Sequence, residues 1–206
     1  MTGISVRQAI SPAEARGFDT AALRRNFVIE DLFAPDEIRM TYMHYDRTVV
    51  GAAVPVTSAL RLETSKPIGS DPFLKRREMG AFNIGGAGTV TLDGEAYEIG
   101  PRTCLYIPMG TAKVTFSSRD ASAPARFYLV SVPAHRRFEA RRIGIDDANR
   151  IELGGQDDAN RRVLRQYIHP DVCASCQLSM GMTLIEMGSV WNTMPCHTHD
   201  RRSEVY

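Results

Sequence analysis

The chain has 206 residues, of which 43% are hydrophobic and 24% are charged, and its formal net charge is +1 at pH 7. This composition is ordinary for a globular protein, and so balanced a charge creates no broad field that would favour nucleic acid or an anionic membrane surface as a partner. No run approaches the roughly 18 apolar residues of a membrane helix, and the N-terminus lacks the apolar core of a signal peptide. We therefore expect a cytoplasmic protein whose four cysteines are thiols rather than a disulfide framework.

The chain begins with a helix candidate and continues with strands. Within residues 11–25, Asp19 precedes a short run of good helix formers and can cap it. Residues 27–29 form a short apolar run of the β type, and residues 38–45 and 48–54 are rich in strand formers. The start of the chain is thus expected to hold one helix followed by three strands.

The dipeptide Asp93-Gly94 predicts a two-residue hairpin, because both central positions of such a turn take positive φ. This loop would place Leu92 opposite Glu95, Val90 opposite Tyr97 and Gly88 opposite Ile99. Apolar side chains then share one face of the hairpin and form a buried stripe: Val90, Leu92, Tyr97 and Ile99.

Short strands at close spacing, separated by Gly and Pro, favour a sandwich or barrel over a parallel α/β sheet. The glycine-bounded strand, hairpin and Leu-Tyr-Ile-Pro run within residues 86–110 resemble a cupin barrel, which is a double-sheet jelly roll. We predict a mainly β chain with two such barrels, a bicupin. Its parts are a metal-free N-terminal barrel at 1–135, a linker with little regular structure at 136–165 and a second barrel beginning at 166–206.

The second barrel is expected to be incomplete in this chain. Its clearest signal is a run of alternating apolar residues: Leu178, Met180, Met182 and Leu184. A jelly roll takes about eight strands, and the residues up to Tyr206 supply at most half of them. We therefore expect a C-terminally truncated chain, or a natural product that continues past Tyr206.

The strongest chemical signal is His197-Thr198-His199 followed by Glu204. Two residues apart on a strand, the imidazoles of His197 and His199 share a face. Glu204 lies five positions after His199 and would face the other way, so a turn within residues 200–203 must return its carboxylate to the imidazoles. This set of ligands suits zinc, iron, manganese or nickel. The competing interpretation is that both histidines are exposed in a polar loop and that Glu204 pairs with a nearby arginine.

The other motifs give weaker evidence of function. Cys173-Ala174-Ser175-Cys176 leads into a strand pattern rather than a helix, so we interpret it as a coincidence and not as a redox motif. Cys196 neighbours a predicted ligand and would face the other side, in a packing role. The glycines within residues 85–88 precede a strand, which excludes a phosphate-binding loop. The remaining histidines are expected to be structural: His44, His135 and His169.

Four segments resemble the 5-keto-4-deoxyuronate isomerase family (4-deoxy-L-threo-5-hexosulose-uronate ketol-isomerases), and together they extend the likeness over the whole chain. The most specific is Trp191 to Arg202 with Glu204-Val205-Tyr206, and the others are residues 83–100, residues 170–181 and Asp46-Arg47 with residues 49–51. The resemblance implies hexameric bicupins that hold a zinc ion in each subunit. It also implies that the zinc ligands are His197, His199, Glu204 and a histidine beyond Tyr206. Without that histidine, tight metal binding and activity of the chain by itself are both in question.

The reaction implied by the resemblance is an aldose–ketose isomerisation in pectin or uronate degradation. It converts 5-dehydro-4-deoxy-D-glucuronate to 3-deoxy-D-glycero-2,5-hexodiulosonate, and a small keto-uronate is then the only partner besides other subunits. The substrate carboxylate calls for a guanidinium clamp, for which there are two arginine pairs: Arg161-Arg162 and Arg201-Arg202. The residues identify no general base. Two alternatives remain, another metallocupin such as an iron-dependent dioxygenase, and a non-catalytic sugar-binding bicupin.

Overall fold

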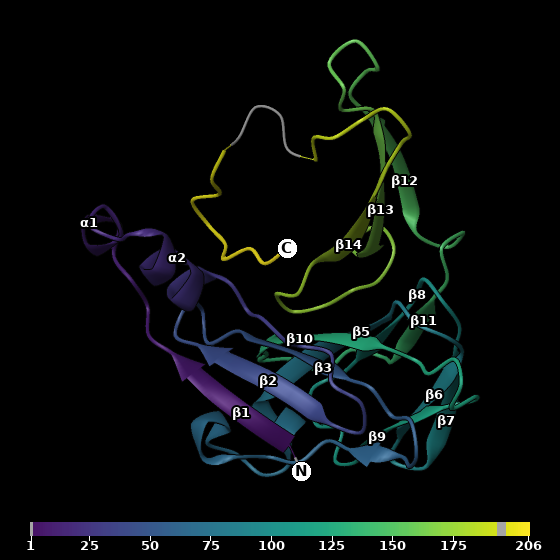
Figure 1. Ribbon diagram of the computed structural model, residues 1–206. Helices are drawn as coiled ribbons and strands as arrows, with labels where there is room; N and C mark the ends of the chain where they lie inside the picture. The colour runs from purple at the N-terminus through teal and green to yellow at the C-terminus, as the bar shows by residue number, and fades with distance from the viewer. Residues whose placement is uncertain (1, 193–196) are drawn as a thin grey trace.

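The computed structural model describes residues 2–192 and 197–206 and is mainly β, as predicted (Figure 1). The helices are α1 (Pro12–Ala15) and α2 (Thr20–Phe27), with the 3-10 turns η1 (Lys66–Ile68) and η2 (Phe73–Arg76). In the described residues, none of these helices has the length and apolar character needed to cross a membrane. The strands are β1 (Thr2–Arg7), β2 (Ile38–Met43), β3 (Val49–Ala53), β4 (Leu60–Arg61), β5 (Arg77–Asn83), β6 (Gly88–Leu92), β7 (Glu95–Ile99), β8 (Thr103–Ile107), β9 (Val114–Ser118), β10 (Phe127–Pro133), β11 (Arg141–Ile143), β12 (Asn149–Leu153), β13 (Arg162–Ile168) and β14 (Met180–Ile185).

Two facing sheets build the first unit as a double-sheet jelly roll. The larger sheet has seven strands in the order β1-β2-β3-β10-β5-β8-β11, and the smaller has four in the order β4-β9-β6-β7. A third, three-stranded sheet of β12, β13 and β14 stands beside them as an open sheet (Figure 1). The second barrel is therefore incomplete in this chain, as expected.

The β6–β7 hairpin has the predicted register. Leu92 pairs with Glu95, Val90 with Tyr97 and Gly88 with Ile99. Asp93 and Gly94 have φ values of 50° and 102°, which a two-residue turn of this kind requires. The predicted stripe is buried apart from Tyr97, which is half-buried at its edge.

Gly86, before β6, and Gly88, its first residue, allow two backbones to approach each other closely. A Cβ on Gly86 would lie 1.9 Å from the carbonyl oxygen of Ala123, and a Cβ on Gly88 would lie 2.5 Å from that of Ser117. The amide of Gly86 donates to the carbonyl of Pro124 at 3.0 Å. These glycines thus permit the close packing of the two backbones.

The N-terminal segment differs in part from expectation. Asp19 caps α2 by accepting a hydrogen bond from the amide of Ala22, as predicted. The strand expected at residues 27–29 is wrong, because Phe27 completes the last turn of α2 and the amide of Val28 still donates to the carbonyl of Arg24. The strand β1 was not expected, and it pairs in parallel with β2.

The seven-stranded sheet is the middle layer of the molecule, with an apolar core on each face. Alternate residues of β5, β8 and β10 face the four-stranded sheet, among them Met79, Leu105 and Leu129. Their neighbours face the third sheet and the loop before β14, and Phe82 and Tyr106 are buried there. Because the strands are buried on both faces, this sheet positions everything that follows it in the chain.

The stretch expected to be an irregular linker is structured, and that expectation was wrong. It contains β11, which pairs with β8, then β12 and the beginning of β13. In β12 the charged side chains of Arg150 and Glu152 point outward and are exposed, whereas Ile151 and Leu153 alternate with them on the other face. Because charged residues dominate this stretch, its alternating pattern was not recognised as a half-exposed strand. The domain limits stay predictions: 1–135, 136–165 and 166–206.

A buried carboxylate joins the first unit to the loop before β14. Glu78 of β5 has no exposed surface. Its two oxygens accept hydrogen bonds from the amides of Cys176, Gln177 and Leu178, each at 2.8 Å, and from the hydroxyl of Tyr106 at 2.7 Å. Burial raises the pKa of Tyr106, and Glu78 raises it further, so the phenol remains a donor. Nothing in the sequence pattern marked this residue.

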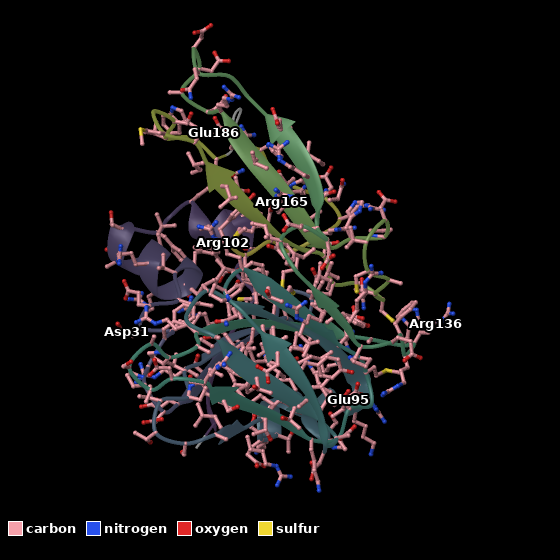
Figure 2. All side chains as sticks on the ribbon, turned by 90° about the vertical axis from the view of Figure 1, so that its right-hand side faces the viewer. Asp31, Glu95, Arg102, Arg136, Arg165 and Glu186 are labelled. Atoms are coloured by element: carbon pink, nitrogen blue, oxygen red, sulfur yellow. The ribbon has the colours of Figure 1, made fainter. Side chains whose placement is uncertain are left out.

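A second link lies on the same interface. The hydroxyl of Tyr167, in β13, donates to the carbonyl of Arg102 at 2.8 Å. Figure 2 shows Arg102 near the junction of the two parts and Arg165 further out on the second one. The loop before β14 and the strand β13 are therefore both tied to the middle sheet.

Candidate metal centre

The segment that carries the predicted ligands, residues 197–206, follows β14 and forms no strand. The strands expected here are wrong. Among the described residues, β14 pairs with β13 alone, so this segment has no neighbouring ladder to complete its backbone hydrogen bonds as a strand. The packing role expected for Cys196 concerns a residue that lies outside the described ranges.

The predicted ligands nevertheless come close together. The Nε2 atom of His199 lies 3.4 Å from Oε2 of Glu204. The rings of His197 and His199 meet edge to face, with centroids 4.9 Å apart and an interplanar angle of 75°. The turn expected within residues 200–203 is present at Asp200 and Arg201, and it returns the carboxylate to the imidazole.

This cluster is open to solvent. The side chain of His199 is 49% exposed and that of Glu204 is 44% exposed. In residues 2–192 and 197–206, no three His, Cys, Asp or Glu side chains are arranged as a group ready to hold a metal. The donor types still fit zinc, which accepts imidazole and carboxylate together. The metal site at His197, His199 and Glu204 therefore stays a prediction.

Two contacts hold this segment against the rest of the chain. Oδ2 of Asp46 accepts hydrogen bonds from the amide of Ser203 at 3.1 Å and from its hydroxyl at 2.6 Å. Arg202 donates through Nη1 to the hydroxyl of Ser179 at 2.9 Å. The residue beside Glu204 is thus fixed to a hairpin of the first unit, about 157 positions earlier in the chain.

That hairpin is strained. Asp46 and Arg47 are the two central residues of the β2–β3 turn, with φ values of 48° and 54°, and the amide of Thr48 donates to the carbonyl of Tyr45. Such a turn favours Asn-Gly or Asp-Gly, and a non-glycine residue in this conformation costs about 1–2 kcal/mol. The positive φ angles of this Asp-Arg pair are known only from the structure, and strain of this kind concentrates at functional sites.

The arginines predicted as a carboxylate clamp have several structural roles. Arg161 pairs with Glu186, with Nε 3.0 Å from Oε2, and Arg162 donates to the carbonyl of Asn160 at 2.9 Å. Arg201 lies exposed in the turn between the candidate ligands. Which of them binds a carboxylate stays a prediction.

The remaining described histidines contact other residues or lie exposed. His44 is exposed and packs edge to face on Tyr42 with centroids 5.3 Å apart. His135 is exposed, and His169 lies 3.4 Å from the carboxylate of Asp171. These placements agree with the structural roles expected for them.

The two cysteines of the Cys-x-x-Cys segment are free thiols. Burial raises the pKa of Cys173 to about 11, so this group is a thiol at neutral pH. Cys176 donates to the carbonyl of Arg136 at 3.1 Å and accepts from its amide at 3.3 Å. In this structure Cys173 is buried and Cys176 bonds to the backbone of Arg136; the interpretation of the motif as a coincidence stays a prediction.

Comparison with known proteins decides the family. Residues 28–206 match the sequence profile of the KduI/IolB family. The chain belongs to the KduI/IolB family. This match covers the first unit from β2 onward and the segment with the candidate metal ligands.

Curated relatives in the family are similar along nearly the whole chain. The 4-deoxy-L-threo-5-hexosulose-uronate ketol-isomerase 2 of Rhizobium meliloti (strain 1021) is 51% identical over 202 residues, covering 98% of this chain and 71% of that protein. The 4-deoxy-L-threo-5-hexosulose-uronate ketol-isomerase of Formosa agariphila is 50% identical over 200 residues, covering 97% and 71%. The chain thus spans about 71% of the length of these relatives.

A solved structure supports the fold. The IolB-like protein of Salmonella typhimurium LT2 superposes with a TM-score of 0.54 at 17% identity, over 69% of this chain and 52% of that one. At this level of identity the likeness concerns the fold alone. The chain covers about half of that protein.

Proposed function

We propose that this KduI/IolB chain is a ketol-isomerase of uronate degradation that converts 5-dehydro-4-deoxy-D-glucuronate to 3-deoxy-D-glycero-2,5-hexodiulosonate. The observation that carries the proposal is the 51% identity, over 98% of the chain, with a relative named for that reaction. The likeness includes the segment of His197, His199 and Glu204, so the proposed chemistry and the proposed site coincide in the sequence.

A zinc centre is the second part of the proposal. His197, His199 and Glu204 would hold one ion in each subunit, together with a histidine from beyond Tyr206. The contact between His199 and Glu204 and the edge-to-face imidazoles support a shared ion. The greater length of the curated relatives supports a further ligand outside this chain. When bound, the ion would supply Lewis-acid polarisation of the substrate carbonyl and enediolate oxygens.

Residues near the candidate ligands would hold Glu204 in position and bind the substrate carboxylate. Asp46 fixes Ser203, and this contact limits the movement of Glu204 next to it. Arg201 lies exposed between the histidines and Glu204, so it is the best placed of the four predicted arginines to bind the substrate carboxylate. Isomerisation also requires a group that takes a proton from one carbon and returns it to the next. Hexameric assembly and a cytoplasmic location stay predictions.

The test combines metal content with turnover. The purified chain and a His197→Ala/His199→Ala variant are compared with His135→Ala, which removes an exposed imidazole outside residues 197–206. We expect zinc in the parent and in His135→Ala, and its loss in the double variant. Turnover of the keto-uronate is followed by product formation under air and under argon.

The outcomes separate the alternatives. Equal zinc in the double variant and the parent would rule out this site. Iron in place of zinc, with oxygen consumed as substrate disappears, would make the protein a dioxygenase. Binding of the keto-uronate without any product, in a chain extended to the length of its relatives, would make it a sugar-binding protein.

A further inference from the structure

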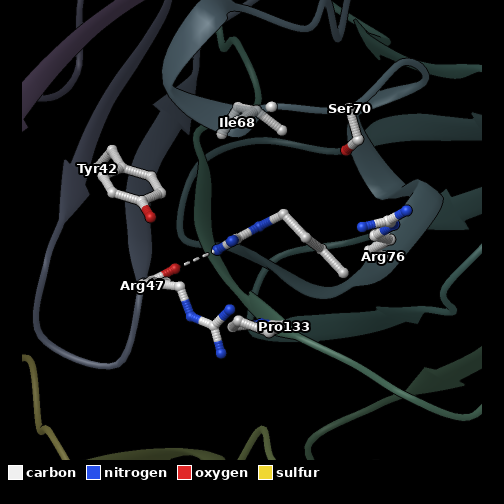
Figure 3. Close-up of a pocket in the computed structure, with 8 residues that line it drawn as sticks. Tyr42, Arg47, Ile68, Ser70, Arg76 and Pro133 are labelled. Carbon is white, nitrogen blue, oxygen red and sulfur yellow. Dashed lines mark hydrogen bonds between the residues drawn. The ribbon is translucent and has the colours of Figure 1, made fainter.

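A pocket at the end of the first unit is lined by three arginines. It has a volume of about 160 Å³, and its walls include Arg47, Arg76 and Arg77 together with the polar side chains of Tyr42 and Ser70. Figure 3 shows Tyr42 and Arg47 on one side of the pocket and Ser70 and Arg76 on the other. Arg76 ends η2 and the next residue, Arg77, begins β5, whereas Arg47 comes from the β2–β3 turn, so the fold adds a distant charge to a neighbouring pair.

The buried arginine is the core of this pocket. Arg77 is 5% exposed. Its Nε donates to the hydroxyl of Ser131 at 3.2 Å, and its Nη2 donates to the carbonyl of Ser131 at 2.8 Å. Nη2 also donates to the carbonyl of Arg47 at 2.6 Å, the bond that is dashed in Figure 3. Every one of these acceptors is neutral. The hydrogen bonds described for this guanidinium leave Nη1 available for a ligand.

No carboxylate balances this charge among the described residues that line the pocket. The ion pairs found within residues 2–192 and 197–206 involve other arginines. Burial lowers the pKa of Arg77 to about 10, Tyr42 opposes this shift and Arg47 adds to it, so the guanidinium is still charged at neutral pH. A buried charge without a counter-charge is costly, and an anion from solution would relieve that cost.

The strained turn fits the same interpretation. Arg47 has a φ of 54°, and its carbonyl accepts from Arg77 while its side chain lines the pocket. A glycine here would ease the turn and would remove the side chain from the pocket. The turn therefore holds an arginine at a position where the backbone favours glycine.

We propose that this pocket binds the oxyanion group of a small ligand, a carboxylate or a phosphate, between the guanidinium groups of Arg47, Arg76 and Arg77. Planar guanidinium groups bind both kinds of oxyanion through paired, charge-assisted hydrogen bonds. The volume admits such a group and little more. This site goes beyond the proposed isomerase function, because none of its residues belongs to the candidate metal segment.

The test is binding of two probes, inorganic phosphate and D-glucuronate, to the whole chain by titration calorimetry, with chloride at matched ionic strength as the blank. The variants are Arg47→Gln and Arg76→Gln, whose side chains are exposed at the rim and which spare the buried Arg77. The matched control is Arg119→Gln, which removes the same charge from an exposed position outside the pocket. Circular dichroism confirms that each variant is folded.

We expect saturable binding of at least one probe, weakened about tenfold by each rim substitution and unchanged in Arg119→Gln. Binding of phosphate alone identifies a phosphate-bearing ligand, and binding of glucuronate alone identifies a sugar acid. The proposal is overturned if neither probe saturates beyond the chloride blank, or if the rim variants bind as tightly as the parent. Because the readout is binding without turnover, this result is independent of the isomerase assay.

Discussion

Glu78 provides the sharpest test of how the two parts of the chain are joined. The substitution Glu78→Gln keeps the shape of the side chain and replaces one acceptor oxygen by an amide donor. Each carboxylate oxygen accepts two hydrogen bonds, so the new NH₂ group would face two donors, for example Tyr106 and the amide of Cys176. We expect the variant to be less stable, with the loss concentrated at the loop before β14.

The magnitude follows from those contacts. A hydrogen bond to a charged group contributes roughly 1.5–3 kcal/mol, and a buried amide left without an acceptor costs about 1–3 kcal/mol. Losing two of the four bonds should therefore cost about 3–5 kcal/mol in the free energy of unfolding. This is a large part of the roughly 5–15 kcal/mol that stabilises a typical domain. For a chain of this size it corresponds to a fall in Tm of about 10 °C.

The assay is urea denaturation at pH 7 followed by circular dichroism, with Glu37→Gln as the control. Glu37 forms an exposed ion pair with Nε of Arg39 at 2.8 Å, and such a pair contributes less than about 1 kcal/mol. If Glu78→Gln unfolds within about 1 kcal/mol of the parent, the carboxylate does not hold the loop and the argument from its hydrogen bonds fails.

Three further predictions concern other parts of the chain. Tyr128→Phe should stabilise the protein by about 1 kcal/mol, since its buried hydroxyl has no partner among the described residues. Burial also raises the pKa of Tyr128 to about 12, so ionisation of this phenol in the unfolded chain lowers the free energy of unfolding as the pH rises from about 10 towards 12 and has no effect below that range. Denaturation midpoints between pH 9 and 12 should therefore fall less steeply in the variant. Gly86→Ala should cost about 3 kcal/mol or more in thermal denaturation, because its Cβ would collide with the backbone opposite, whereas Gly155→Ala, which has open space, should cost less than about 1 kcal/mol. Asp46→Gly keeps the positive-φ turn and removes the acceptor for Ser203, so hydrogen exchange at the Ser203 amide should accelerate; unchanged exchange would mean that this contact does not hold the segment.

Local signals in the sequence were sufficient where one short motif determines the geometry. Asp93-Gly94 predicts the whole β6–β7 register, since a two-residue turn leaves no freedom in the pairing. Asp19 likewise predicts the start of α2 through a single capping hydrogen bond. In both cases the interacting residues are neighbours in the chain.

Features that depend on distant partners could not be predicted in this way. The four donors around Glu78 come from positions 28 to 100 residues away, so nothing near it in sequence marks its burial. The strand β12 was missed because exposed Arg150 and Glu152 dominate its composition. For the candidate site, the turn that returns Glu204 to His199 was expected and is present. The strand expected around His197 is absent from the described residues, because a strand is stabilised by hydrogen bonds to a neighbouring strand.

The seven-stranded sheet with an apolar core on each face has a consequence for how the molecule can be divided. A fragment ending after β10 would contain the buried residues of the core against the smaller sheet, but its outer face would present Phe82, Cys104 and Tyr106 to water. Exposed apolar area of that kind promotes association between copies. The fragment would therefore aggregate in expression trials even though its own interior is intact, and the residues after β10 act as a cover that keeps the sheet in solution.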